Sequence, residues 1–364
     1  MHSKRTLATG SCGAAPQGIS VIVPAYNAAA TIAVCLAPLL KMQANGEITE
    51  IMVIDDGSTD ATAALAAETG VRVMPSGGRL GPGGARNVGA QHAHGDVLWF
   101  VDADTVAHED AARVLSAALE DTDVDAVFGA YDDHPTAPSF WSQYKNLVHH
   151  HYHRQGDREA ETFWAGCGAV RKAEFIAVGG FDSATYTRPS IEDIELGLRM
   201  RQRGMRILLV ADIQVTHLKV WLLPNLLHTE IFCRALPWSR LIHSCSGWID
   251  SLNVSRAERA RSLIAIAFLA SVPLLLISPW LTFAMLLVVI AANWKLTSLF
   301  RRRRGTAFAL AAILFHQIYY FYCAGAIAWT WLEHAKSTIH AALSRRADLR
   351  QNRSANATAL VADD

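Results

Sequence analysis

The chain has 364 residues, enough for one large domain with an appendage or for two domains. Its 33 Lys and Arg residues balance its 33 Asp and Glu residues, so no overall field points to nucleic acid as a partner. Six cysteines are scattered without a Cys-x-x-Cys pair, which favours free thiols in a reducing compartment. Residues 1–17 are small and polar and predict a flexible leader rather than a signal peptide. We therefore expect the first two-thirds of the chain in the cytoplasm.

Apolar runs alternate with helical patterns in the first half of the chain. Strands are predicted over 18–24, 48–54 and 71–74, with helices over 28–42 and 58–68 between them. This alternation predicts an α/β domain with a mainly parallel sheet and right-handed crossovers. Further elements are expected as a strand over 97–101, a helix over 109–119, a strand over 125–129, helices over 140–154 and 191–199, and strands over 206–210 and 213–216.

The strand over 97–101 has only apolar side chains and runs directly into Asp102-Ala103-Asp104. Such a strand is typical of the centre of a sheet, and its carboxyl end is where α/β proteins bind ligands. Two carboxylates there are hard oxygen ligands for Mg²⁺ or Mn²⁺, which often complete their shell with substrate phosphates. The alternative is that Asp104-Thr105 simply caps the next helix.

Residues 76–89 contain six glycines and Arg86. Glycines let backbone N–H groups approach an anion at a helix start, and Arg86 can add a charge-assisted bond. A mobile surface loop is the alternative. The glycine spacing excludes the dinucleotide-binding and Walker patterns.

Two further places carry candidate chemistry. Glu192 and Asp193 lie in the first turn of a predicted helix, where the helix dipole favours ionised carboxylates. Stabilisation of the helix end explains one acid, and the second can accept a proton from an attacking hydroxyl. His217 ends a strand in the same sense as Asp104 and is predicted as a third metal ligand, with a structural histidine as the alternative.

Aromatic residues and glycines are mixed over 162–170, which suits a loop beside a ligand or, alternatively, a core strand with a bulge. Cys167 within it is a minor candidate for a thiol nucleophile. The helix over 140–154 carries His149, His150, His151 and His153. Consecutive helical positions point to different faces, so we expect solvated or interfacial histidines rather than a metal site.

Taken together, six motifs in this order resemble those of the family 2 glycosyltransferases over residues 18–220. They are Val21-Ile22-Val23-Pro24-Ala25-Tyr26-Asn27, Val53-Ile54-Asp55-Asp56-Gly57-Ser58-Thr59-Asp60, Ala85-Arg86-Asn87, Asp102-Ala103-Asp104, Gly179-Gly180-Phe181-Asp182 and Glu192-Asp193-Ile194-Glu195-Leu196. The resemblance implies the GT-A fold, a UDP- or GDP-sugar donor, a Mg²⁺ or Mn²⁺ cofactor, and transfer of a hexose with inversion by one in-line displacement.

The resemblance also implies roles for individual residues. Nucleotide-sugar contacts are expected from Pro24, Ala25, Tyr26, Asn27, Asp55, Asp56, Gly57, Ser58, Arg86, Asp102 and Ala103, and metal contacts from Asp102, Asp104 and His217. Asp193 resembles the general base, with Glu192 as its neighbour, and Phe163, Trp164, Gly166 and Cys167 would form the acceptor-side loop.

The chain departs from the pattern of the processive synthases of the family, which carry Gln-x-x-Arg-Trp. The nearest segment here is Arg234-Ala235-Leu236-Pro237-Trp238, so single transfer is favoured. We expect a hydroxyl acceptor that is lipid-linked or membrane-proximal, as for a cell-envelope glycan. The alternatives are a polyprenyl-phosphate glycosyltransferase and a non-catalytic nucleotide-binding membrane scaffold; a nucleotidyltransferase is disfavoured because it needs no base like Asp193.

The rest of the chain predicts a membrane attachment. After a glycosyltransferase domain over 18–217, residues 218–260 mix Trp, Leu and basic residues as interfacial helices do, with a plain core helix pair as the alternative. Residues 261–332 predict two or three transmembrane helices, the first two forming a hairpin broken at Ser278-Pro279. Residues 333–364 are expected as a polar, partly disordered tail. These features predict a multi-pass inner-membrane protein with a cytoplasmic catalytic domain, although three spans place the basic tail outside, against the positive-inside rule.

Overall fold

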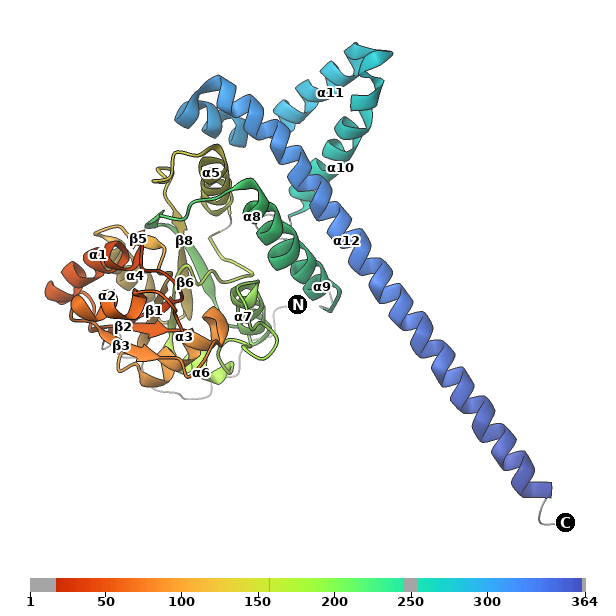
Figure 1. Cartoon of the computed structure of the whole chain (residues 1–364), viewed down its shortest axis with the longest axis horizontal. Coiled ribbons are helices and arrows are strands. Elements are labelled where there is room, and N and C mark those ends of the chain that lie inside the picture. The colour runs from red at the N-terminus through yellow and green to blue at the C-terminus, as the bar shows by residue number, and fades with distance from the viewer. Residues whose placement is uncertain (1–17, 157, 245–254, 362–364) are drawn as a thin grey trace.

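The computed structural model describes residues 18–156, 158–244 and 255–361 of the chain, so the predicted leader and part of the predicted interfacial segment, residues 245–254, lie outside the described residues. An eight-stranded mixed sheet forms the centre of the first domain (Figure 1). Its strands are β1 (Ile19–Ala25), β2 (Glu50–Asp55), β3 (Arg72–Pro75), β4 (Val97–Val101), β5 (Thr105–Ala107), β6 (Ala126–Tyr131), β7 (Cys167–Arg171) and β8 (Ile207–His217). Their order across the sheet is β3-β2-β1-β4-β7-β6-β8-β5.

The strand directions confirm the predicted α/β class with a mainly parallel sheet. β1 pairs in parallel with β2 and β4, β2 with β3, and β6 with β8. β7 runs antiparallel to both β4 and β6, and β5 runs antiparallel to β8. Because β1, β2 and β4 are parallel, their carboxyl ends meet at one edge of the sheet.

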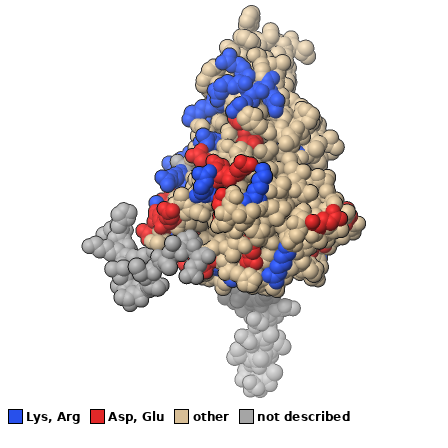
Figure 2. All heavy atoms as spheres, turned by 90° about the vertical axis from the view of Figure 1, so that its left-hand side faces the viewer, with Lys and Arg blue, Asp and Glu red and all other residues tan. Residues whose placement is uncertain are grey.

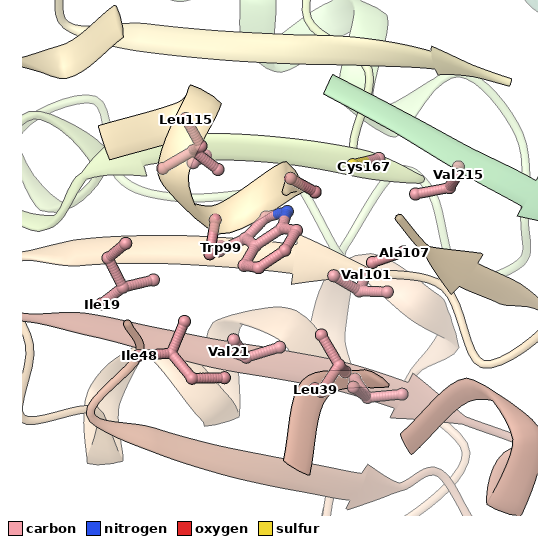
Figure 3. Packing of buried hydrophobic residues seen from close by; sticks show 14 of the residues in the cluster. Ile19, Val21, Leu39, Ile48, Trp99, Val101, Ala107, Leu115, Cys167 and Val215 are labelled. Carbon is pink, nitrogen blue, oxygen red and sulfur yellow. The ribbon is translucent and has the colours of Figure 1, made fainter. Parts of the chain in front are cut away.

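Helices cover both faces of the sheet. On one face lie α1 (Ile32–Ala44), α2 (Thr62–Glu68) and α4 (Ala111–Leu119), and on the other lie α3 (Gly81–His92), α6 (Lys172–Ala177) and α7 (Glu192–Gln202). Side chains alternate along β4, so Trp99 and Val101 enter the first layer while Leu98 and Phe100 enter the second. Figure 3 shows Trp99 at the centre of the first layer, between Ile19 of β1 and Leu115 of α4.

Two local predictions differ from the structure. The expected strands over 206–210 and 213–216 form the single strand β8, whose register against β6 shifts near Gly129. Part of the predicted aromatic loop is the strand β7, which was the alternative interpretation of residues 162–170.

Of the solvated or interfacial histidines expected in α5 (Phe140–Gln155), two lie at the interface between α5 and the sheet rather than in solvent. His150 and His153 are buried, and their Nδ1 atoms lie 2.7 and 2.9 Å from the carbonyl oxygens of Tyr131 and Gly129. The two rings lie one helical turn apart on one face, so both reach β6 and attach α5 to the sheet.

The rest of the described chain is helical. The elements are α8 (Leu223–His228), the π-helix η1 (Thr229–Ala235), α9 (Leu236–Ser244), α10 (Arg256–Ser271), the 3₁₀ helix η3 (Val272–Leu276), α11 (Pro279–Ala292) and α12 (Trp294–Val361), which is interrupted at Gly305. The predicted break at Ser278-Pro279 is confirmed, since α11 begins at Pro279. In the structure, α12 continues through most of the predicted tail, to Val361.

Within the described residues, two helical stretches are long and apolar enough to cross a membrane, Arg256–Leu276 and Trp294–Thr338. A buried acid holds the first of them to the rest of the molecule. The Glu258 carboxylate pairs with Arg261 and accepts hydrogen bonds from Tyr152 of α5, at 2.9 Å, and Tyr320 of α12, at 2.7 Å. Burial of a charge is tolerated only with such partners, so this carboxylate joins three helices.

We predict that Glu258→Leu lowers the stability of the protein far more than Tyr152→Phe. The first change leaves the Arg261 charge without its buried partner and removes two hydrogen bonds, for about 3 kcal/mol or more, whereas the second removes one hydrogen bond, for about 1 kcal/mol. Thermal unfolding of the detergent-solubilised variants measures the difference. Equal unfolding temperatures for the two variants would contradict the role given to Glu258.

Candidate active site

A cavity of about 1180 Å³ opens at the carboxyl ends of β1 and β4. Its walls near the sheet come from the β1 exit loop, from the Asp102–Asp104 segment and from the start of α7. It continues past α5 and η1 to side chains of α10 and α12. The predicted donor site, the predicted base and the C-terminal helices therefore border one space.

The centre of this site is a buried ion cluster around Arg86. The Arg86 side chain is 4 % exposed, and its Nη2 atom lies 2.6 Å from Oδ1 of Asp102. Its Nη1 atom lies 3.4 Å from Oε1 of Glu192. α3 and α7 pack on the same face of the sheet, and β4 ends between them, so one guanidinium reaches both carboxylates. Burial raises the pKa of Asp102, and the Arg86 charge opposes this increase.

Asp104 and His217 come together through the antiparallel pairing of β5 with β8, which sets Thr105 opposite His217. The Nε2 atom of His217 lies 3.8 Å from Oδ2 of Asp104, and Tyr131 stacks on the His217 ring at 4.3 Å. Burial acts to raise the pKa of Asp104, but hydrogen bonding to His217 and the charge of Lys219 outweigh it, so that pKa is lowered. Asp104 is thus kept ionised.

These residues fit a divalent ion only in part. Within residues 18–156, 158–244 and 255–361, no three His, Cys, Asp or Glu side chains lie close enough together to hold a metal. Asp104 and His217 offer an oxygen and a nitrogen side by side, whereas Asp102 is engaged by Arg86. Two protein ligands suffice for Mg²⁺ or Mn²⁺ when phosphate oxygens and water supply the others.

Asp193 lies in the first turn of α7 and borders the same cavity. Its Oδ2 atom accepts a hydrogen bond from the backbone N–H of Ala165 at 3.1 Å. Burial and the neighbouring charge of Glu192 raise the pKa of Asp193 to about 6, against the opposing charge of Arg86. A carboxylate with such a pKa is a competent proton acceptor near neutral pH.

The Ala165 loop is brought to this position by the sheet. β7 is antiparallel to β4, with Cys167 opposite Val101, so the residues before β7 arrive where β4 ends. The backbone N–H of Asp102 donates to the Gly166 carbonyl at 3.2 Å. The donor-side and acceptor-side segments are therefore fixed to each other by backbone bonds.

The predicted acceptor-side residues divide into two pairs. Phe163 and Trp164 border the cavity, while Gly166 and Cys167 lie behind it. Burial raises the pKa of the Cys167 thiol to about 12, which disfavours the thiolate that a nucleophile needs.

The predicted donor residues divide in a similar way. Those that border the cavity are Pro24, Tyr26, Asn27, Arg86, Asp102 and Ala103, while Ala25, Asp55, Asp56, Gly57 and Ser58 do not. Both carboxylate oxygens of Asp56 accept bonds from the glycine-rich segment, 2.8 Å each from the N–H groups of Leu80 and Gly81 and from the Ser76 hydroxyl. Asp56 thus shapes the start of α3 in this structure.

Several polar residues of the cavity wall are not predicted from the sequence. Lys145 of α5 pairs with Glu230 of η1 at 2.6 Å, and Arg234, one helical turn further on, lies 3.6 Å from the same carboxylate. Arg79 lies over the Tyr26 ring at 4.2 Å. No local pattern marks Lys145 or Glu230, because only the packing of α5 against η1 brings them together.

The fold and the cavity define an α/β protein that binds its ligand at the carboxyl edge of a mainly parallel sheet. Residues 20–179 match the model of the family described as "Glycosyl transferase family 2". The match confirms, for this part of the chain, the resemblance to family 2 glycosyltransferases that the six motifs carry.

Two relatives show the extent of the similarity. Glycosyltransferase GlyG of Streptococcus pneumoniae is 32% identical over 118 residues, which are 31% of this chain and 38% of the relative. The uncharacterized protein MT1568 of Mycobacterium tuberculosis is 30% identical over 209 residues, 51% of this chain and 62% of the relative. The chain thus spans less than two-thirds of the length of these relatives.

Among solved structures, the mannosyltransferase PcManGT from Pyrobaculum calidifontis, in complex with GDP-Man and Mn²⁺, aligns with a TM-score of 0.47 at 19% identity. The alignment covers 86% of this chain and 88% of that one.

We predict that Asp193→Asn stabilises the folded protein at neutral pH. Folding raises the pKa of this carboxyl from 3.8 to about 6, so its stabilising contribution is present below pH 3.8 and lost as the pH rises through 6. Above pH 6 the buried charge opposes folding, and a neutral amide removes roughly 1–3 kcal/mol of cost. Thermal unfolding at pH 7.5 tests this, with the exposed Asp123→Asn as the matched control. A lower unfolding temperature for Asp193→Asn than for Asp123→Asn would contradict the assigned environment.

Proposed function

We propose that the protein is an inverting glycosyltransferase that moves one sugar from a nucleotide-sugar donor to an acceptor hydroxyl at the membrane. The observation that carries this proposal is the presence of Asp193, with its raised pKa, in the same cavity as Asp102 and Asp104. The match of residues 20–179 to the family 2 glycosyltransferases supports the donor class.

The donor lies along the ends of β1 and β4 in this proposal. Tyr26 and Asn27 contact the nucleoside, and Arg79 lies beside them over the Tyr26 ring. Asp104 and His217 would hold a divalent cation, which would neutralise the charge that develops on the leaving group. The Arg86 bridge holds Asp102 in place beside this site.

Asp193 is the general base on the acceptor. The acceptor oxygen forms a bond to the anomeric carbon as the bond from that carbon to the diphosphate oxygen breaks. The acceptor proton moves to Asp193, and the nucleoside diphosphate leaves with the electron pair of the broken bond. Attack opposite the leaving group inverts the anomeric centre. Glu192 keeps its neighbour's pKa high and is itself held by Arg86 and by the backbone N–H of Ser190 at 2.8 Å.

The acceptor reaches the base from the membrane half. Beyond Trp164 the cavity is bordered by apolar side chains, among them Trp238 of α9, Leu263 and Ile266 of α10, and Ile327 of α12. Apolar walls suit a lipid chain, and this supports a lipid-linked acceptor at the cytoplasmic face of the inner membrane.

A second acceptor class has its own support. Lys145 and Arg234 place two cations in the cavity wall against the single charge of Glu230. This local excess of one positive charge suits an acceptor phosphate, as in a polyprenyl-phosphate glycosyltransferase. A phosphate is already ionised and needs no base, so the two classes differ in their dependence on Asp193.

Sugar transfer from radiolabelled UDP- and GDP-sugars to a bacterial lipid extract, followed by lipid extraction, tests the proposal. We expect labelled lipid with one donor. The Asp193→Asn variant should lose at least about a hundredfold in transfer rate, which corresponds to about 3 kcal/mol of transition-state stabilisation. Retained transfer in that variant supports the phosphate acceptor. Absence of transfer with every donor, in a protein that still binds a nucleotide, would favour the non-catalytic scaffold.

The pH dependence of transfer gives a further prediction. A general base must be unprotonated, so the rate at low acceptor concentration should fall as the pH drops below about 6, the pKa of Asp193. Initial rates measured from about pH 4.5 to about pH 8.5 cover the range in which this fall in rate is expected. A rate that is flat down to pH 4.5 would exclude Asp193 as the base.

A further inference from the structure

The hairpin made by α10, η3 and α11 has an apolar surface that does not suit water. Residues 262–294 contain no Asp, Glu, Lys, Arg or His. At the tip, Leu276 is 96% exposed, Ile277 82% and Trp280 79%. Figure 1 shows this hairpin standing away from the sheet domain. Exposed apolar patches of this kind mark protein or membrane contacts.

The first arm of the hairpin, Arg256–Leu276, is long enough to cross a bilayer, but the return arm is too short to cross back. α11 has 14 residues, which at a rise of 1.5 Å reach about 21 Å, against about 30 Å of hydrocarbon. A hairpin that crossed would also place its turn in water on the far side. Here the turn holds the most exposed apolar side chains of the hairpin.

Basic residues gather at the opposite, open end of the hairpin. Arg256, Arg259 and Arg261 lie at the start of α10, and Lys295 and residues 301–304, all arginine, follow α11. Figure 2 shows uncharged atoms at the top of the molecule above a band of basic side chains. Arginine and lysine favour the cytoplasmic headgroup layer, so both ends of the hairpin belong to the same side.

The part of α12 that follows Gly305 exposes apolar side chains and buries polar ones. Its exposed large side chains include Leu310, Leu314, Ile318 and Phe321, at intervals of three or four residues, whereas the polar His316 lies buried. A helix that faces water shows the opposite arrangement. The outer face of this segment therefore suits lipid.

The same part of α12 contacts helices α5 and α9 of the preceding chain at two widely separated points. Near its start the Phe308 ring lies 5.0 Å from Phe140 of α5. Further along the helix, the Glu333 carboxylate accepts two hydrogen bonds from Arg240 of α9, at 3.1 Å each. The helix between these contacts is about 38 Å long at 1.5 Å per residue, which exceeds the thickness of the hydrocarbon layer.

Both contacts belong to the same body, because α9 continues from η1, and Glu230 of η1 pairs with Lys145 of α5. A helix that crossed the bilayer between residues 308 and 333 would carry one of these contacts to the far side. The contacts at both ends of this stretch of α12 are therefore incompatible with a crossing between residues 308 and 333.

We propose that the chain enters only one leaflet of a lipid bilayer and does not cross it. The α10–α11 hairpin dips into the hydrocarbon, and α12 lies in the plane of the membrane with its apolar face in lipid. The tail then lies on the same side as the catalytic domain, where the positive-inside rule favours its Lys336, Arg345 and Arg346. This arrangement replaces the two or three crossings expected from the sequence, and it does not depend on the proposed activity.

The test places an azide-bearing amino acid at one of three positions of the full chain, expressed in a bacterium. Ser278 reports the hairpin tip, Lys336 reports the end of the α12 segment, and Ile176, 62% exposed on the sheet domain, is the matched reference. A membrane-impermeant cyclooctyne is added to intact spheroplasts, to permeabilised cells and to mild detergent extracts. Each variant must keep the unfolding temperature of the parent protein.

We expect no reaction at any position in intact spheroplasts. Permeabilisation should expose positions 176 and 336, while position 278 stays at least about tenfold slower until detergent removes the lipid, because hydrocarbon excludes the aqueous reagent. Reaction at 278 or 336 in intact spheroplasts would show a crossing and overturn the proposal. Reaction at 278 as fast as at 176 after permeabilisation, or protection that persists in detergent because a protein covers the tip, would also overturn it.

Discussion

The site depends on one buried guanidinium between two carboxylates that come from different elements. Arg86 of α3 bonds Asp102 at the end of β4 and Glu192 at the start of α7. Without this cation, the acids at the end of β4 and the start of α7 would repel one another in a poorly solvated place. With it, α3 and α7 are fixed relative to the sheet, and Asp193 stands beside the donor end of the cavity. The raised pKa of Asp193 follows from the same arrangement, since Glu192 is its neighbour and burial removes its water.

Much of this arrangement is predictable from the sequence, because it rests on local patterns. The apolar run before Asp102 marks a central strand, the glycine-rich segment marks a helix start, and Ser278-Pro279 marks a break. The pairing of His217 with Asp104 was expected because both follow strands, and β5 pairing with β8 brings them together.

The parts that sequence reasoning missed arise from contacts between distant segments. Lys145 and Glu230 are far apart in the chain, and only the fold of α5 onto η1 pairs them. His150 and His153 appeared as a polar helix face, yet they serve buried carbonyl groups of β6. The hydrogen bonds that Asp56 accepts from the backbone N–H groups of Leu80 and Gly81 also join distant segments, and its position in the motif does not reveal them. For the C-terminal helices, hydropathy shows how long the apolar segments are, but it does not show which face of each helix is covered by protein.

The cavity links the two halves of the chain. Its polar end lies at β4 and α7, and its apolar end lies between α9, α10 and α12. If α12 lies in the plane of the membrane, the apolar end opens at the depth of the lipid headgroups. A lipid-borne acceptor then reaches Asp193 without leaving the bilayer, while a water-soluble donor enters from the side of the sheet. This division of access would give the helices that follow the α/β domain a role in bringing the acceptor to Asp193.

The most direct test of the account is donor binding to the detergent-solubilised protein, measured as the thermal shift with UDP- and GDP-sugars in the presence and absence of Mn²⁺. The account predicts stabilisation by one nucleotide class that requires Mn²⁺, survives Asp123→Asn and disappears in Asp104→Asn. Folded protein that no nucleotide sugar stabilises, or an equal Mn²⁺-dependent shift in Asp104→Asn, would contradict the donor site at the end of β4.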